Sequence, residues 1–200
     1  YYFSGGYEIE TKNYNNALNQ TNELLKRDQV VIYDAAIKYN NLFIRTDILV
    51  KNKNHIDLIE VKAKSFEGDG EQDFLNKKGC IYSSWQPYLY DVAFQKYVVQ
   101  NAFPNCPISA YLMMANKKAI CPTDGLNQKF RIVRSDQGRK KVVVSQNLSK
   151  EDLKDPILIR VNVDECCNLV YSEKFGDKTF AEYVNTLADF YFRDQKISTS

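Results

Sequence analysis

Three carboxylate side chains recur at equal spacing in the first third of the chain. Asp34, Asp47 and Glu60 follow one another at intervals of thirteen residues, and Lys62 stands two residues after Glu60. Carboxylate oxygens are the ligands that Mg²⁺ and Mn²⁺ prefer in proteins. If the fold brings these side chains together, the chemistry that they could support is the binding of a divalent cation.

Three strand-like segments carry these residues, and short asparagine-containing turns separate them. The segments are Val30–Tyr39, Leu42–Lys51 and His55–Lys64. Asn40-Asn41 lies between the first two segments, and Lys53-Asn54 lies between the last two. Asparagine tolerates the left-handed backbone conformation that tight hairpin turns require. The pattern therefore predicts an antiparallel meander of three strands.

Two-residue turns would decide which side chains lie opposite one another. Asp47 would then face Glu60 on one side and Asp34 on the other, with Lys62 next to Glu60 on the same face. Like charges directly opposite on neighbouring strands destabilise a sheet, and apolar surroundings screen them poorly. A bound cation, a raised carboxyl pKa or a nearby base would offset the repulsion. The other interpretation is a solvent-facing sheet surface with scattered charges.

A helix is predicted after the meander, with Ser83 or Ser84 as its N-cap and its end near Ala102. Apolar residues cover nearly every direction around its axis, which is typical of a buried helix. Asp91 and Gln95 interrupt this pattern, and their spacing of four residues puts them on one stripe. Because buried polar groups need partners, the two residues either bond to each other or face the row of carboxylates.

The remaining segments predict an α/β domain built on a mixed sheet. The further elements that we expect are a helix over about 13–27, a mobile loop over 66–81, a strand over about 108–115, strand-like segments after 116 and one or two helices over 164–193. We expect a single domain over 1–200, with a core at about 13–116 and a mixed α/β extension at about 117–200. The opening residues indicate a fragment of a longer protein.

The composition is that of an ordinary globular protein and excludes several classes. Hydrophobic residues make up 44% of the chain and charged residues 26%, and the net charge of +2 does not by itself indicate a nucleic-acid partner. No apolar run is long enough to span a membrane, and the first residues do not form a signal peptide, so we expect a cytoplasmic protein without a membrane partner.

Histidine and cysteine are too few or too scattered for several kinds of metal site. His55 is the only histidine, which excludes zinc sites built from several histidines. The five cysteines include no pair with the Cys-x-x-Cys spacing, so no iron–sulfur cluster is expected. We expect the thiols to be reduced and mostly buried.

Asp47, the triplet Glu60-Val61-Lys62 and a buried helix carrying Gln95, in this order, resemble the PD-(D/E)XK nuclease superfamily. The similarity is closest to its RecB-like branch and to the nuclease domain of a family of uncharacterised bacterial multidomain proteins. It covers about residues 30–100. The resemblance implies a restriction-endonuclease-like core of helix, three-strand meander, helix and strand, which binds Mg²⁺ or Mn²⁺ and hydrolyses the phosphodiester bonds of DNA.

The resemblance also implies roles for individual residues of the metal site. Asp47 and Glu60 would bind the metal ion together with the backbone carbonyl of Val61. From its expected position beside Asp47, we add Asp34 as a further partner of the metal. Lys62 would orient the attacking water or help to deprotonate it.

Contacts with the substrate involve two more residues. Gln95 would contact the metal site or a DNA phosphate, and Lys64 is a further candidate for binding the nucleic acid. The DNA could be single- or double-stranded, and other domains of the parent chain would be additional partners.

This chain departs from the family pattern, and two alternatives stay open. Relatives often carry a histidine on an upstream helix and a tyrosine four residues after the glutamine, whereas His55 lies at a turn and Val99 stands at the tyrosine position. One alternative is a catalytically degenerate nucleic-acid-binding module of a larger bacterial protein. The other is an interaction domain whose tyrosines and phenylalanines only build the core.

Overall fold

The computed structural model describes residues 2–134 and 140–196. In the described part of the chain, the main sheet is mixed and contains six strands. In their order across the sheet, these strands are β1 (Tyr7–Glu8), β2 (Gln29–Tyr39), β3 (Leu42–Asn52), β4 (His55–Phe66), β5 (Ile108–Asn116) and β8 (Leu158–Asn162). The predicted α/β fold with a mixed sheet is confirmed.

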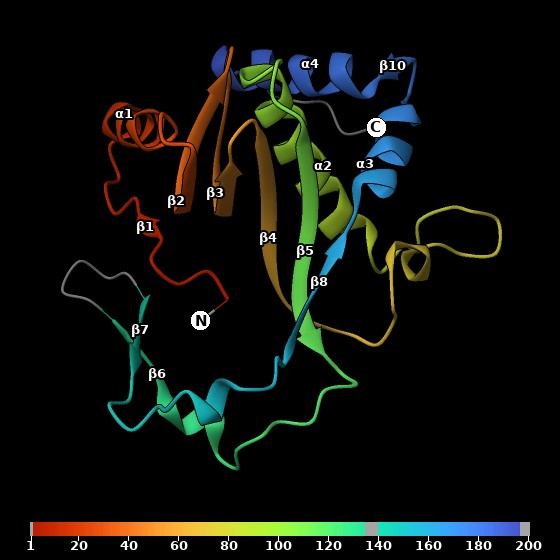
Figure 1. Ribbon diagram of the computed structural model, residues 1–200. Helices are drawn as coiled ribbons and strands as arrows, with labels where there is room; N and C mark the ends of the chain where they lie inside the picture. Colours follow the sequence, from red (N-terminus) through yellow and green to blue (C-terminus); the bar gives the residue numbers. More distant parts are fainter. Residues whose placement is uncertain (1, 135–139, 197–200) are drawn as a thin grey trace. The chain divides into compact units, whose positions relative to one another are not determined.

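The described residues form four α-helices beside the sheet. They are α1 (Tyr14–Leu24), α2 (Gln86–Ala102), α3 (Asp164–Ser172) and α4 (Phe180–Phe192). Helix α1 lies against β2, and α2 contacts β2, β3 and α3 (Figure 1). None of the helices in the described part of the chain combines the length and the apolar character that crossing a bilayer requires.

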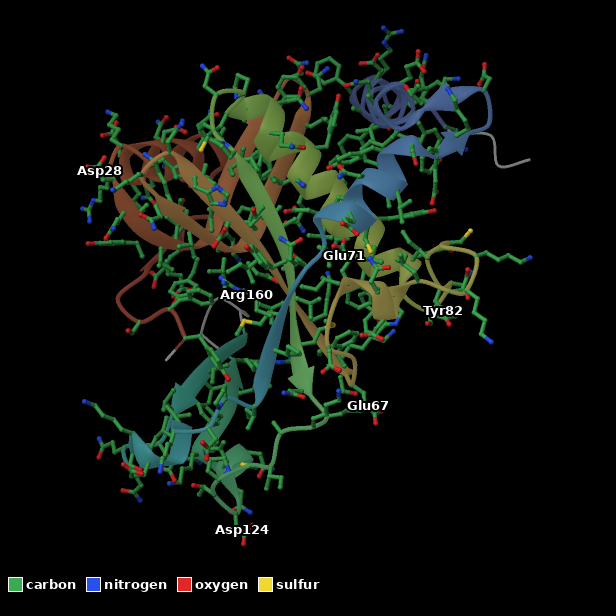
Figure 2. All side chains as sticks on the ribbon, turned by 45° about the vertical axis from the view of Figure 1, so that its right-hand side comes forward. Asp28, Glu67, Glu71, Tyr82, Asp124 and Arg160 are labelled. Carbon is green, nitrogen blue, oxygen red and sulfur yellow. The ribbon has the colours of Figure 1, made fainter. Side chains whose placement is uncertain are left out.

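Short elements fill the connections. They are the 3₁₀ turns η1 (Glu71–Phe74), η2 (Leu126–Lys129) and η3 (Glu151–Leu153), and the strand pairs β6 (Phe130–Arg134) with β7 (Lys140–Val144) and β9 (Lys174–Phe175) with β10 (Lys178–Thr179). The segment expected to be a mobile loop over 66–81 therefore contains the end of β4 and η1. Figure 2 labels Glu71 of η1, whose Oε1 accepts the Cys166 N–H of α3 at 2.5 Å.

The chain divides into two compact units. The larger unit comprises Tyr2–Lys62, Gly68–Met113 and the chain from Arg160 onward, and the smaller comprises Ala63–Glu67 and Met114–Ile159. Asp34, Asp47, Glu60, Lys62 and Gln95 all belong to the larger unit, whereas Lys64 belongs to the smaller one.

The meander has the register that two-residue turns predict. Tyr39 pairs with Leu42 across the first turn, and Asn52 pairs with His55 across the second. Asn40 and Lys53, the first residues of the two turns, have φ of +51° and +54°. Asparagine thus takes the left-handed conformation in one turn, while lysine takes it in the other.

Helix α1 begins and ends within the predicted range. The Asn13 side chain caps its N-terminus by accepting the Asn16 N–H at 3.0 Å, which satisfies one of the free donors of the first turn. The buried hydroxyl of Thr21 accepts the Ala36 N–H at 3.0 Å and thereby attaches the helix to β2.

Helix α2 begins later than predicted, because a turn precedes it. The Trp85 and Gln86 N–H groups both bond to the Tyr82 carbonyl, so Trp85 is the N-cap and the prediction of Ser83 or Ser84 is wrong. The interior of the helix is buried as expected, and it includes Lys96, whose ammonium lies 2.7 Å from Asp164 Oδ1 of α3.

The cysteines differ from expectation in their exposure. Cys166 and Cys167 are buried in α3, but Cys80 and Cys121 are exposed and Cys106 is half-buried. The prediction of mostly buried thiols is therefore wrong, because three of the five lie in connections between elements. Burial raises the pKa of the Cys167 thiol to about 12, so that side chain is protonated at neutral pH.

In the smaller unit, Asp152 joins several connecting segments. Its carboxylate accepts hydrogen bonds from Lys129 Nζ at 2.6 Å, from the Ser149 N–H at 2.7 Å and from Thr123 Oγ1 at 2.9 Å. The Lys129 ammonium, followed by the Ser149 and Thr123 donors, holds the pKa of this carboxyl well below its ordinary value.

We expect the smaller unit to lose this stabilisation in acid. Since the folded-state pKa of Asp152 lies below the unfolded value of about 3.9, its contribution is complete above that pH and disappears as pH falls toward the folded value. Amide hydrogen exchange of Ser149 should therefore be faster in Asp152→Asn than in wild type at neutral pH. When each rate is corrected for its intrinsic pH dependence, the two should begin to approach each other below about pH 3.9 and continue to do so as the pH falls toward the folded-state pKa of Asp152. A difference that stays constant as the pH falls would contradict the assignment.

Candidate metal and phosphodiester site

The β3–β4 hairpin positions the first pair of candidate residues. Ile48 pairs with Ile59, and the next positions along the two strands are Asp47 and Glu60. There the carboxylate of Asp47 bonds to the neighbouring strand, because its Oδ2 accepts the Val61 N–H at 2.8 Å. Asp47 is exposed, whereas Glu60 is buried. The Asp47 carboxylate is thus accessible to solvent, whereas the Glu60 side chain is largely shielded from it.

Glu60 is held on both of its oxygens. Oε1 accepts from Lys62 Nζ at 2.7 Å, and Oε2 accepts from Gln95 Nε2 at 2.8 Å. Burial raises the pKa of Glu60, and the charge of Asp47 adds to this effect, while the bonds from Lys62 and Gln95 oppose it; the net direction is upward. The raised pKa of Glu60 and the nearby Lys62 therefore partly offset the repulsion between the neighbouring carboxylates.

Helix α2 contributes Asp91 and Gln95 to the same place. Asp91 Oδ2 accepts from Lys62 Nζ at 2.6 Å, and Asp91 Oδ1 accepts from Gln95 Nε2 at 3.1 Å. Both expectations for the stripe are realised, since the two residues bond to each other and also face β4. Glu60, Lys62, Asp91 and Gln95 form a closed ring of hydrogen bonds, which we call the four-residue ring.

Lys62 is charged within this ring. Burial would lower the pKa of its ammonium, but the hydrogen bonds and charges of Asp91 and Glu60 together outweigh burial and raise it. The acidic side chains of Asp47, Glu60 and Asp91 outnumber the single ammonium of Lys62 in this cluster. This excess of acidic groups favours the binding of a divalent cation.

Asp34 is placed differently from its neighbour Asp47. The ladder between β2 and β3 continues on both sides of Asp34, but Asp34 itself has φ of +58°. Its carboxylate receives two hydrogen bonds from Arg45, at 2.5 Å to Oδ2 and at 3.1 Å to Oδ1. Arg45 also donates to the carbonyls of Ile9 and Thr11. Asp34 therefore has a cationic partner of its own, and among the described residues it makes no hydrogen bond or ion pair with the four-residue ring.

Val61 and Lys64 are the other residues predicted from the sequence. Val61 is exposed and its N–H bonds to Asp47, so the role predicted for its carbonyl stays a prediction. Lys64 lies near the end of β4 and is half-buried. Its contact with nucleic acid likewise stays a prediction.

The donor set suits a hard divalent cation. Asp47 and Glu60 provide carboxylate oxygens, and Gln95 Oε1 is a buried oxygen to which no described residue donates a hydrogen bond. Within the residues that the structure describes, no group of three or more His, Cys, Asp or Glu side chains is arranged to hold a metal ion. Two side-chain carboxylates would therefore need the Gln95 oxygen, a backbone carbonyl or water to complete the coordination.

Comparison with known proteins adds no assignment. Neither the protein-family models, nor the curated proteins, nor the solved structures include a match to this chain. The chemistry of the site must therefore be argued from its own residues.

Two contacts were not foreseen from the sequence: the bond of Asp91 to Lys62 and the contacts of Arg45. The polar stripe on an otherwise apolar helix was a signal for Asp91, although it did not specify Lys62 as the partner. Arg45 had no such signal, because its partners Ile9, Thr11 and Asp34 come from distant parts of the chain.

Proposed function

We propose that this chain is a nuclease that requires Mg²⁺ or Mn²⁺ and hydrolyses phosphodiester bonds of DNA. The observation that carries the proposal is the clustering of Asp47, Glu60 and Lys62 at one end of the β3–β4 pairing, with Gln95 bonded to Glu60. The order of helix, meander, helix and strand supports a restriction-endonuclease-like core of the RecB type.

Each residue of the cluster has a chemical task in this proposal. Asp47 and Glu60 hold the cation, which lowers the pKa of bound water and neutralises charge on the phosphate. Lys62 places a positive charge where negative charge develops during attack on phosphorus. Gln95 fixes the orientation of Glu60 through its hydrogen bond at 2.8 Å. The exposure of Asp47 leaves one side of the cluster open to substrate.

The proposal is tested by incubating the protein with end-labelled single- and double-stranded DNA. Cleavage is expected with Mg²⁺ or Mn²⁺ and not with EDTA. The matched control is Glu60→Gln, which keeps the size of the side chain but removes its charge and should be inactive. Equal cleavage by wild type and Glu60→Gln would show a contaminating nuclease, and no cleavage of any DNA by wild type would contradict the proposal.

One observation favours a second function, a catalytically degenerate nucleic-acid-binding module. Both oxygens of Glu60 already accept hydrogen bonds within the protein, and the described residues include no group of three or more His, Cys, Asp or Glu side chains that could hold a metal ion. In that case the same DNA would be retarded in a gel at low salt without being cut, and EDTA would change nothing.

A further inference from the structure

Asp91 bonds to two residues of the proposed site, but the proposed function assigns it no task. Its side chain is 40% exposed, and its carboxylate accepts from Lys62 on one oxygen and from Gln95 on the other. Both neighbours also bond to Glu60. Asp91 therefore contacts the two residues that orient Glu60 without contacting Glu60 itself in any described hydrogen bond.

The four-residue ring has a strict pattern of donors and acceptors. Lys62 and Gln95 each donate two hydrogen bonds, one to Glu60 and one to Asp91. Glu60 and Asp91 only accept. An ionised carboxylate accepts on both oxygens, whereas an amide accepts on one atom and donates from the other. The position of Asp91 thus requires a carboxylate, because Asn would set its NH₂ against a donor.

The four-residue ring also explains how Lys62 can keep its position when Glu60 binds a cation. A cation held by Glu60 competes with the Lys62 ammonium for the same carboxylate, because both are positively charged. Lys62 Nζ also donates to Asp91 Oδ2 at 2.6 Å, and this second partner belongs to the buried helix α2. Lys62 therefore retains one fixed anionic partner on an element separate from β4.

We propose that Asp91 is the positioning residue of the site, which holds the Lys62 ammonium in place beside the scissile phosphate while Glu60 is engaged with the cation. This role rests on the proposed nuclease function. Asp91 acts through Lys62 and does not itself bind the metal ion or the substrate.

The test is a double-mutant cycle on the cleavage rate. With the DNA that wild type cuts, Asp91→Ala should lower kcat about 10- to 100-fold, which is typical of residues that orient a metal site, and should leave KM and Mn²⁺ affinity unchanged. In the Lys62→Ala background, Asp91→Ala should cause no further loss, because the residue through which it acts is already gone. If the double variant lost kcat by the product of the two single-variant losses, the proposal would be overturned.

Two conservative variants separate positioning from packing. Asp91→Glu keeps two acceptor oxygens and should recover part of the rate, whereas the isosteric Asp91→Asn should be nearly as slow as Asp91→Ala. A role in packing alone predicts the reverse order. The matched control is Asp57→Ala, which removes an ion-paired carboxylate on β4 that contacts His55 and Arg160 and should not change kcat.

The remaining outcomes are also decisive. A fall in Mn²⁺ affinity as large as the fall in kcat would make Asp91 a metal ligand and would overturn the positioning role. Wild type that cuts no DNA with any divalent cation would overturn the proposed function together with this role. An active wild type with an unchanged Asp91→Ala variant would overturn the role alone.

Discussion

Calorimetric titration with Mn²⁺ should show binding to the wild-type chain and none to Asp47→Ala. Asp47 is the exposed carboxylate of the cluster, and among described hydrogen bonds it engages only one oxygen, with the Val61 N–H. Its removal leaves Glu60 as the sole metal-binding carboxylate, and both Glu60 oxygens are occupied by Lys62 and Gln95. Cleavage should fall to the level seen with EDTA.

Stability provides an independent measurement of the same binding. A ligand present at 100 times its Kd stabilises the folded state by about 2.7 kcal/mol. Mn²⁺ at that concentration should therefore raise the Tm of wild type and leave that of Asp47→Ala unchanged. Asp47→Asn keeps an acceptor for Val61 and controls for the lost hydrogen bond, while Asp57→Ala controls for loss of a carboxylate elsewhere on the sheet. Equal Mn²⁺ responses in wild type and Asp47→Ala would refute the metal site.

Lys62→Ala should abolish most of the cleavage while it preserves metal binding. The ammonium cannot be a metal ligand, because it has no lone pair to donate. Its charge stabilises the negative charge that develops on the phosphate, and the loss of one such group costs about 100- to 1000-fold in kcat. Cleavage assays and Mn²⁺ calorimetry on the same preparation separate the two effects.

The control for this prediction is Lys26→Ala, the same substitution at an exposed lysine paired with Glu23 near the end of α1. It should leave kcat unchanged. Lys62→Ala also removes a partner of Glu60 and Asp91, so circular dichroism must show that the variant is folded. Cleavage by Lys62→Ala at the wild-type rate would remove Lys62 from the mechanism.

The geometry of the hairpins could be predicted from sequence because it depends on neighbouring residues. Two short turns with asparagine decide the register of three strands, and that register carries Asp47 to the position next to Glu60. The stripe of Asp91 and Gln95 was likewise visible, because two polar residues four apart on an apolar helix need partners. Local patterns of this kind do not depend on distant parts of the chain.

The surroundings of Asp34 could not be predicted, because they depend on contacts between distant segments. Asp34 has a left-handed backbone conformation and pairs with Arg45. Arg45 also donates hydrogen bonds to the carbonyls of Ile9 and Thr11, which precede α1. The start of α2 was missed for a related reason, since the turn at Tyr82 satisfies the donors that a serine cap would have satisfied. The alternation of side chains along β2 predicted a face of the sheet for Asp34, but it could not identify Arg45 as its partner.

The two-residue turn between β3 and β4 restricts how sequences can diverge around this site. Because side chains alternate along a strand, a single inserted residue between Asp47 and Glu60 that kept the tight turn would rotate one carboxylate to the opposite face. Lengthening both strands by one residue would preserve the facing pair. In chains that keep this site with a tight turn, the sequence numbers of the two acids should therefore differ by an odd number, as the thirteen of Asp47 and Glu60 does. Such a parity rule could be used to screen sequences that share no other detectable similarity.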